Sequence, residues 1–155
     1  MTATSVQKCL NCRQRAVRPT VLPLYTQEME HDGRKYSISL KDFHVYRCGN
    51  CSEIVVDDSG TDRLTDALRV AAGLLLPSEI RRNREALGFT QQQLADCLRI
   101  SMFTLSRWES GAQIQQRCMD LSLRAFFDVE EFRNYVGASA HFGGASIAQP
   151  NFAAS

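Results

Sequence analysis

The sequence lacks any apolar run long enough to cross a membrane. A membrane-spanning helix needs roughly 18 apolar residues, and the most apolar stretch, residues 70–76, is interrupted by Gly73. Residues 1–5 show no basic segment followed by an apolar core, so we expect no secretion signal. With 44% hydrophobic and 23% charged residues, the composition is that of a folded, soluble chain, which we expect in the cytoplasm.

A charge of one sign is also lacking. The 18 Lys and Arg residues and the 17 Asp and Glu residues leave a formal net charge of +1. Residues 1–76 and 77–136 are each close to neutral, and residues 137–155 carry no charge. Bulk electrostatic attraction to nucleic acid is therefore excluded, and any affinity for DNA must come from local geometry.

Cysteine, in contrast, is abundant and patterned. Four of the six cysteines form two Cys-x-x-Cys pairs, Cys9/Cys12 and Cys48/Cys51. In a reducing compartment such pairs bind metal more often than they form disulfides. Two tight turns that each aim two sulfurs at one ion complete the tetrahedral shell of a structural Zn²⁺. We therefore predict one structural zinc ion with no open coordination position, which argues against a catalytic metal.

The cysteines also fit other roles. One pair is compatible with dithiol redox chemistry, although the second pair would then be unexplained. A thiol oxidoreductase or a zinc hydrolase would need partner groups, and no His, Glu and Asp constellation accompanies the cysteines. We interpret His31 and His44, between the pairs, as strand surface. Cys97 and Cys118 are predicted to be small buried side chains.

The two cysteine pairs share a local pattern. Asn11 and Asn50 each stand in the third place of their Cys-x-x-Cys turn. Asn tolerates the left-handed backbone conformation that such turns require, and we predict it there. Four thiolates on one Zn²⁺ carry a net charge of −2 (−4 + 2), which nearby basic side chains can offset. These side chains are Lys8, Arg13, Arg15 and Arg47.

Between and beyond the cysteines, residues 1–57 are predicted to form a small β module. Tyr36, Ile38 and Leu40 alternate with polar residues, as in a half-buried strand. Asp32-Gly33 is a hairpin signal because both residue types tolerate a positive φ. The predicted strands cover residues 21–25, 36–40, 43–46 and 54–56.

The rest of the chain is predicted to be helical up to an uncharged tail. Apolar residues recur every three or four positions from Leu64 to Leu75, which indicates an amphipathic linking helix within residues 58–76, with Thr61 as its N-cap. Residues 77–136 form the second domain, whose first helix begins near Pro77. Residues 137–155 are rich in Gly, Ala and Ser, and we expect a flexible tail.

A helix-turn-helix is the second strong pattern. Thr90 followed by Gln93 is a capping box, which opens a helix over residues 91–98. Arg99 and Ile100 form the turn, where a side chain in a positive-φ position costs roughly 1 kcal/mol. A second helix over residues 102–110 is capped by Ser101 and ended by Gly111. Two short helices on a tight turn are typical of DNA-reading proteins.

The second helix of this motif is predicted to read bases in the major groove. Its inner face carries Leu105 and Trp108, whereas Arg107 is the single basic residue on the outer face and suits guanine O6 and N7. Phe103 and Met102 suit thymine methyl groups. Gln91, at a helix start, suits a phosphate. The predicted DNA-binding set is Arg107, Phe103, Met102, Ser106, Thr104, Ser101, Gln91 and Arg99.

Plainer interpretations of the same residues remain. The apolar spacing also fits a helical hairpin that merely closes a core, and Arg107 also fits a solvated surface charge. Arg81 and Arg82 are candidate phosphate contacts, but ordinary surface positions are the more common case for such residues. An apolar stripe after the motif closes the core, forms a dimer seam, or does both. It comprises Leu121, Ala125, Phe126, Val129, Phe132 and Tyr135.

Taken together, the two cysteine pairs, the linking helix and two helical segments resemble MqsA-type antitoxins, which join a YgiT-type zinc finger to an Xre-like helix-turn-helix. The segments are Leu76-Pro77-Ser78-Glu79-Ile80-Arg81 with Leu87-Gly88-Phe89-Thr90-Gln91, and Leu105-Ser106-Arg107-Trp108-Glu109-Ser110-Gly111. The resemblance covers about residues 7–125. The helical motifs alone are widespread, and their combination with the cysteine module is the specific feature.

The resemblance implies a fold and a function. It implies zinc on Cys9, Cys12, Cys48 and Cys51, and a lambda-repressor-like helical domain that dimerises through its C-terminal region. It implies binding to a palindromic operator in double-stranded DNA, with Arg107 as a base-reading residue. Where the best-known members of the family have a polar base-reading residue, this chain has Phe103, which suggests a different operator. It also implies a buried ion pair between Arg84 and Glu109.

The function implied is that of a transcriptional repressor acting as the antitoxin of a type II toxin–antitoxin system. The N-terminal module would bind a toxin, although nothing in residues 20–47 identifies such a partner. The alternative is a solitary zinc-finger and helix-turn-helix regulator without a toxin. A toxin-like gene beside this one separates the two hypotheses. Neither hypothesis involves an enzyme.

Overall fold

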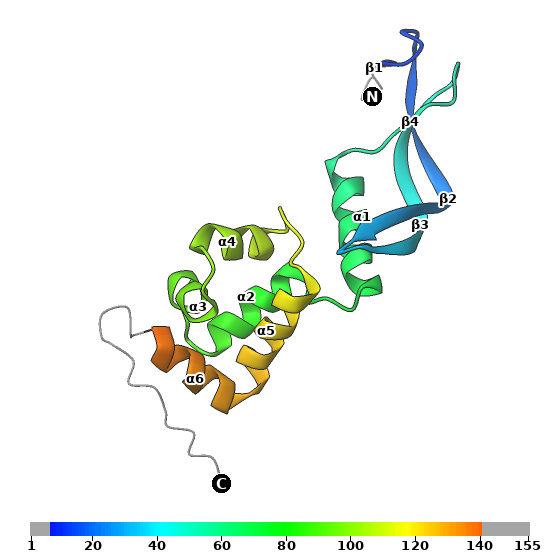
Figure 1. Ribbon diagram of the computed structural model, residues 1–155. Helices are drawn as coiled ribbons and strands as arrows, with labels where there is room; N and C mark the ends of the chain where they lie inside the picture. The colour runs from blue at the N-terminus through cyan, green and yellow to red at the C-terminus, as the bar shows by residue number, and fades with distance from the viewer. Residues whose placement is uncertain (1–6, 141–155) are drawn as a thin grey trace. The chain divides into compact units, whose positions relative to one another are not determined.

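The computed structural model describes residues 7–140, and the two kinds of structure predicted from the sequence follow each other along the chain (Figure 1). An antiparallel β module with four clustered cysteines comes first, and six described helices follow it. The predicted fold class is confirmed. The chain divides into a compact unit that ends at Leu74 and a second unit that begins at Leu75.

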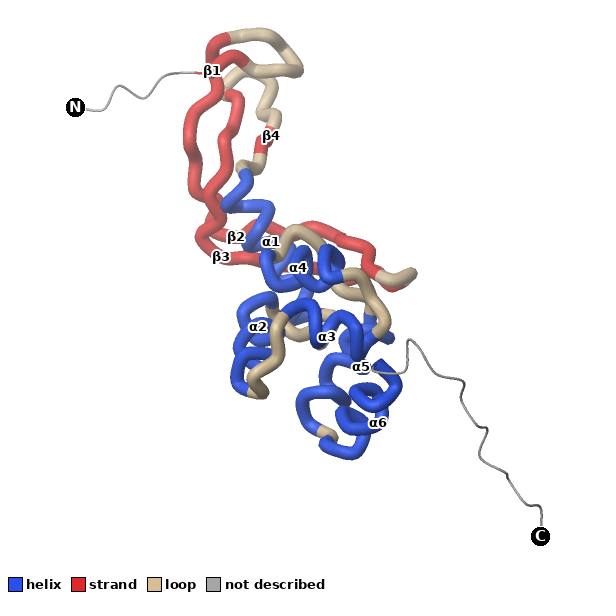
Figure 2. The backbone as a smooth tube through the Cα atoms, turned by 90° about the vertical axis from the view of Figure 1, so that its left-hand side faces the viewer, coloured by secondary structure: helices blue, strands red, loops and turns tan. Residues whose placement is uncertain are grey.

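A long β-hairpin dominates the first unit (Figure 2). Asp32 and Gly33 join its strands with φ of 54° and 72°, as their sequence signal predicts. The four strands pair antiparallel in chain order. They are β1 (Gln7–Lys8), β2 (Arg15–His31), β3 (Arg34–Cys48) and β4 (Ile54–Val55).

The strands β2 and β3 are longer than predicted. The segments 36–40 and 43–46, expected as separate strands, belong to one strand that continues through Lys41 and Asp42. Asp42 has φ 48°, and the pairing on its two sides joins Leu22 to Phe43 and Leu24 to Lys41. This irregularity interrupts the alternation of buried and exposed residues, which explains why the pattern looks like two short strands.

The helix α1 (Asp58–Ala71) packs against β3 within the first unit (Figure 1). Leu64 and Leu68 are buried on α1, as their spacing predicts, and Ile38, Phe43 and Val45 are buried on β3. The helix therefore closes a core over the hairpin.

The N-cap of α1 differs from the prediction. Asp57, and not Thr61, caps the helix: the Asp57 carboxylate accepts a hydrogen bond of 2.8 Å from the backbone N–H of Gly60. The Thr61 hydroxyl donates to the backbone carbonyl of Asp57. A carboxylate is a strong acceptor for free N–H groups at a helix start, and the helix therefore begins earlier than predicted.

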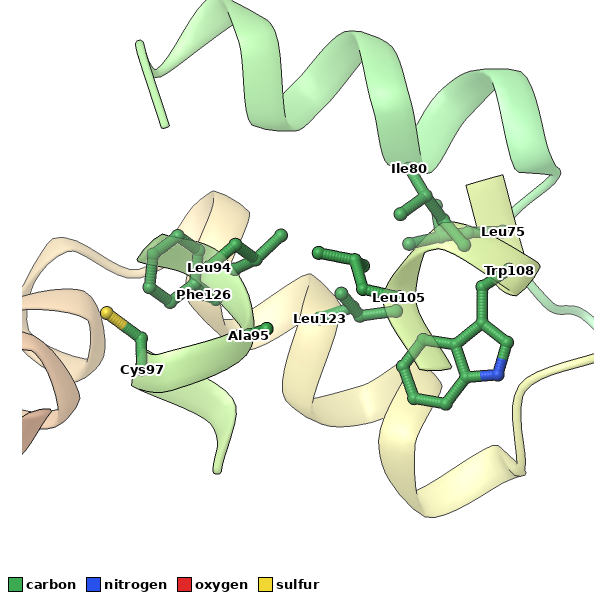
Figure 3. Packing of buried hydrophobic residues seen from close by; sticks show 9 residues of the cluster. All are labelled: Leu75, Ile80, Leu94, Ala95, Cys97, Leu105, Trp108, Leu123 and Phe126. Atoms are coloured by element: carbon green, nitrogen blue, oxygen red, sulfur yellow. The ribbon is translucent and has the colours of Figure 1, made fainter. Parts of the chain in front are cut away.

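The second unit consists of five described helices. Figure 3 shows the buried side chains of its core. The last helix continues to Ala140, into the segment predicted as a tail from residue 137, and the remaining tail lies outside the described residues. The helices are α2 (Pro77–Ala86), α3 (Gln91–Leu98), α4 (Met102–Ser110), α5 (Arg117–Asp128) and α6 (Glu130–Ala140). The buried core comprises Leu75, Ile80, Leu94, Ala95, Cys97, Leu105, Trp108, Leu123 and Phe126.

Buried polar side chains fix the first residue of this unit. The backbone N–H of Leu75 donates to Asp120 Oδ1 at 2.8 Å, and the Leu75 carbonyl accepts from Gln115 Nε2 at 2.7 Å. Gln115 also donates to Asp120, and Arg124 donates to the second Asp120 oxygen. Both backbone groups of Leu75 are thereby satisfied without a neighbouring strand or helix turn.

Replacing Asp120 with alanine is expected to destabilise the second unit by about 1–3 kcal/mol. The reason is that the Leu75 N–H and the Gln115 amide lose a buried acceptor. Urea unfolding followed by the fluorescence of Trp108, the single tryptophan, measures this. Asp128→Ala, at an exposed position of the same helix, is the control and should stay within about 0.5 kcal/mol. Equal stability of both variants would contradict a structural role for the Asp120 hydrogen bonds.

Candidate functional site

The four paired cysteines converge on one point of the first unit. Their Sγ atoms all lie within 4.8 Å of one another, and Cys9–Cys51 and Cys12–Cys48 are each 3.6 Å apart. All four are free thiols. Sulfurs bound to one tetrahedral ion at about 2.3 Å would be about 3.8 Å apart. The cysteines are therefore placed to hold a metal ion, as the sequence predicts, and their all-sulfur set suits Zn²⁺.

The two cysteine turns have the same backbone geometry. The N–H of Arg13 donates to the carbonyl of Cys9 at 2.9 Å, and the N–H of Ser52 donates to that of Cys48 at 3.0 Å. Arg13 and Ser52 each have φ 61°. The left-handed residue is thus the one after the second cysteine. The prediction that Asn would adopt this conformation is wrong.

The asparagines serve the site in another way. Asn11 Nδ2 lies 3.8 Å from Cys51 Sγ, and the side chain of Asn50 hydrogen-bonds Cys12. Each asparagine thus donates to the second cysteine of the opposite turn. An amide donor stabilises a thiolate, so both residues favour the ligand form of the sulfur. The repeated Asn is visible in the sequence, but the exchange between the turns depends on the fold.

The pKa values of the thiols diverge. A backbone hydrogen bond from Gln14, together with the side chain of Asn50, lowers the pKa of Cys12 to about 6. A backbone hydrogen bond at Glu53 also lowers the pKa of Cys51, but burial and the other three sulfurs outweigh it and raise that pKa to about 11. Four adjacent thiols therefore do not all ionise by themselves, whereas a bound divalent cation favours four thiolates.

The surroundings of the cluster fit a structural site. Cys9 and Cys48 are buried with Val17, and this small cluster has few other apolar members. The side chains predicted to offset the charge, Lys8, Arg13, Arg15 and Arg47, are all exposed near the turns. Neither His31 nor His44 joins the cysteines in the described part of the chain.

The two unpaired cysteines differ from each other. Cys97 is buried, as predicted, and burial raises the pKa of its thiol. Cys118 is exposed, so the prediction that it is buried is wrong. It lies near the start of α5, whose inward face is formed by Asp120, Leu123 and Phe126 instead.

The helix-turn-helix of the second unit forms as the sequence predicts. The helices α3 and α4 cover residues 91–98 and 102–110, and Thr90 and Gln93 make the reciprocal capping box. Ser101 accepts a hydrogen bond from the N–H of Thr104, and Gly111 ends α4 with φ 82°. Arg99 keeps the left-handed turn conformation with φ 55°, so the turn type is retained despite the side chain.

The outer face of α4 is open. Leu105 and Trp108 are buried, while Phe103 is 74% exposed and Arg107 is exposed. Met102 differs from the expectation, because it is half-buried and packs against the core. Half-buried Ser106 lies next to Arg107, and Thr104 shares a side-chain hydrogen bond with Ser101.

A buried ion pair holds α4 against the first helix of the unit. Arg84 Nε and Nη2 donate to the two Glu109 oxygens at 2.6 and 2.9 Å, and the residues are only 8% and 4% exposed. The implied pair is therefore confirmed. Gln91 Nε2 donates to Glu109 at 2.8 Å, which the sequence did not indicate. Arg84 also donates to the carbonyl of Phe89, before α3. The network joins α2, α3 and α4.

The remaining predicted DNA contacts lie on α2, at the start of α3 and in the turn after it. Gln91 is half-buried, with its amide engaged by Glu109. Arg99 is exposed and donates to the carbonyl of Ser139. Arg81 and Arg82 are exposed on α2, and Arg81 Nε lies 3.7 Å from Glu109.

The apolar stripe of the last two helices divides. Phe126 is fully buried, and Phe132 packs against the core. Leu121 and Tyr135 are 69% and 73% exposed, and Val129 is also exposed. One part of the stripe thus closes the core, and the other part is a free apolar surface.

Comparisons with known proteins agree with the helix-turn-helix observed in the second unit. A helix-turn-helix family model (HTH_3) matches residues 80–117, which include α3 and α4. This type of domain belongs to DNA-binding transcription regulators and is not an enzyme class. A search of curated proteins gives no match. Together with the cysteine cluster, the match fits an MqsA-like architecture. Within residues 7–140, no helix has both the length and the apolar character for crossing a membrane.

Proposed function

We propose that the protein is a zinc-stabilised transcriptional repressor that reads a palindromic operator with α4. The observation that carries this proposal is the open outer face of α4, where Arg107 and Phe103 project from a capped helix inside a helix-turn-helix. The buried Arg84–Glu109 pair holds α4 against α2, so the backbone that carries its outer side chains is fixed in place. Such a repressor acts where the DNA is, in the cytoplasm.

The DNA contacts divide into base and phosphate contacts. Arg107 is the base reader, because its planar fork can donate two hydrogen bonds to guanine. Ser101, Thr104 and Ser106 line the same helix, and Arg99 lies at the turn. Gln91 has its amide on Glu109, so its part in phosphate binding falls to the free N–H groups at the start of α3.

The zinc ion has a structural role in this proposal. Cys9, Cys12, Cys48 and Cys51 would hold it, and the ion would supply only a fixed tetrahedral link between the two turns. All four ligands come from the protein, so no position is left for a substrate. The parts proposed are a zinc module (1–57), a helix (58–76) and a DNA-binding and dimerisation domain (77–136).

Dimerisation follows from the small reading surface. One short helix contacts few base pairs, and two-fold symmetry places two such helices one DNA turn apart. Leu121, Val129 and Tyr135 offer an exposed apolar surface in the C-terminal helical region for that contact. The operator would then be palindromic.

The antitoxin role is the finer part of the proposal. It is supported by the resemblance to MqsA-type antitoxins and by the joint presence of a four-cysteine module and a helix-turn-helix. A toxin would bind the N-terminal module. The second candidate is a solitary regulator, which shares every feature except the toxin.

Replacing Arg107 with alanine is expected to remove the preference for operator over random DNA. The loss of a bidentate guanine contact should cost about 1–3 kcal/mol in operator binding. Zinc content and thermal stability should not change, because Arg107 is exposed. Competition binding with both DNAs measures the preference, and Arg34→Ala, at the hairpin tip, is the control. An unchanged preference in Arg107→Ala would remove this residue from the base-reading role.

Footprinting tests the whole proposal. The full chain is bound to the DNA upstream of its own gene, with and without the co-expressed product of the neighbouring gene. A two-fold symmetric footprint supports the repressor, and a footprint altered by a neighbour that co-purifies with the chain supports the antitoxin. A symmetric footprint without any such neighbour supports the solitary regulator. No protection at any sequence would overturn the DNA-binding proposal.

A further inference from the structure

The outer face of α4 carries two large exposed side chains. Phe103 and Arg107 are one helical turn apart and exposed. The nearest polar side chains offer little else: Ser110 donates its hydroxyl to the carbonyl of Arg107, within its own helix turn. The face therefore presents the guanidinium of Arg107, the short hydroxyl of Ser106 and the large apolar ring of Phe103.

Of the two apolar residues at the start of α4, only one can reach a ligand. Met102 packs against the core and is half-buried. Phe103 is 74% exposed, although an aromatic side chain in water is unfavourable. Its ring has no hydrogen-bonding atom, so it cannot distinguish bases by donors and acceptors. It gains free energy by covering apolar surface.

The major groove offers one such surface. Among the four bases, thymine alone carries an apolar group there, its C5-methyl, which phenylalanine can contact. We propose that Phe103 is the specificity residue for a C5-methylated pyrimidine. The inference rests on the proposed function, because it requires α4 to lie in the groove.

The spacing along α4 places this base. Four residues of helix rise span about 6 Å, so the methyl lies within about two base pairs of the guanine read by Arg107. The ring contacts only the methyl group and has no means to recognise the rest of the pyrimidine. A 5-methylcytosine at this position would therefore keep the contact, whereas cytosine and uracil lack the methyl group and would bind more weakly.

The test exchanges single methyl groups in the DNA. Operator duplexes from the footprint carry deoxyuridine in place of each thymine in turn, and a second series carries cytosine or 5-methylcytosine at the sensitive position. Removing one contacted methyl should weaken binding about fourfold, the loss expected for one buried carbon. In the second series, 5-methylcytosine should bind about fourfold more tightly than cytosine.

Protein variants assign the effect to the ring. In Phe103→Ala the thymine and uracil duplexes should bind equally, while Phe103→Leu should keep the difference. Val70→Ala, at an exposed apolar position of α1, is the control and should behave like the unchanged chain. If the uracil duplex binds more weakly because its curvature differs, the difference would persist in Phe103→Ala. A difference caused by direct contact with the ring would disappear in that variant.

The outcomes separate the two proposals. If no sequence is protected, the DNA-binding proposal itself fails. A normal footprint with equal binding of all thymine and uracil duplexes would overturn the role of Phe103 alone. A methyl effect that survives in Phe103→Ala would also overturn it, because another residue would then read the methyl group.

Discussion

With zinc bound at the four cysteines as proposed, its removal is expected to unfold the two cysteine turns of the first unit and to leave the second unit folded. Strands β1 and β4 are two residues long each, and the buried cluster between them consists of Cys9, Cys48 and Val17. Such a small core cannot hold the two cysteine turns together. In small zinc domains the ion contributes an apparent binding free energy of about 10–16 kcal/mol, and the proposed ion would replace the missing core here.

Two variants and a chelator test this expectation. Cys48→Ser removes a buried ligand, and Cys118→Ser, at an exposed cysteine outside the cluster, is the matched control. Metal analysis should find one zinc per chain in the control and a large loss in Cys48→Ser. Amide resonances of the two turns should collapse to unfolded positions after the mutation or chelation.

The second unit supplies an internal reference in the same sample. Trp108 lies in its core, and its unfolding transition in urea should stay unchanged when the metal is removed. Persistence of dispersed resonances from both cysteine turns in the metal-free chain would contradict a structural role for the ion. A shift of the Trp108 transition would show instead that the units are energetically coupled.

Replacing Glu109 with glutamine is expected to destabilise the second unit by about 3–5 kcal/mol. The variant leaves the guanidinium of Arg84 buried without its counter-charge, and an unpaired buried charge is costly. It also perturbs the acceptor of Gln91, so α2, α3 and α4 lose their shared contact. Urea unfolding followed by Trp108 fluorescence measures the change.

A matched control exists for this variant. Glu85 also pairs with Arg84, at 3.3 Å, but its side chain is 60% exposed. Glu85→Gln should therefore cost at most about 1 kcal/mol. Replacing both Arg84 and Glu109 with methionine should recover most of the stability, because no buried charge is left unpaired. Equal losses for Glu85→Gln and Glu109→Gln would contradict the buried-pair account.

The same pair predicts a dependence of stability on pH. Burial by itself raises the pKa of Glu109, but hydrogen bonds from Arg84 and Gln91 and the charges of Arg84 and Arg81 outweigh it and hold the pKa below the usual range of a glutamate. A carboxylate with a lowered pKa stabilises the fold above its unfolded pKa. That contribution is lost as the pH falls through the folded pKa. As the pH falls through the folded pKa of Glu109, acid should therefore destabilise Glu109→Gln less than the unchanged chain.

Local sequence signals predicted the elements whose cause is local. Thr90 with Gln93, Ser101 and Gly111 define the ends of α3 and α4 through contacts within a few residues. The Asp32-Gly33 turn is set in the same way. The four-cysteine site was also predictable, because two short turns with two sulfurs each leave one economical arrangement.

Resemblance supplied one contact that local signals do not contain. Arg84 and Glu109 are far apart in the sequence, and neither composition nor periodicity indicates that they pair. The structure confirms the pair and adds Gln91, because three helices must meet before their polar groups become neighbours. At the start of α1 the signal is local but ambiguous, because Asp57 and Thr61 can both accept a hydrogen bond from a free N–H group. The carboxylate of Asp57 is the stronger acceptor and caps the helix.

Sequence alone determined that this chain has a sulfur-ligand module and a helix-turn-helix, since both depend on residue type at short, fixed spacing. Only the tertiary structure decided which side chains project. Met102 and Phe103 are adjacent apolar residues, yet one packs on the core and the other is exposed. Cys97 and Cys118 differ in the same way, because Cys97 is buried and Cys118 is exposed. The physical reason is that the burial of a side chain depends on which neighbouring helices cover it. The local sequence around a residue does not contain that information.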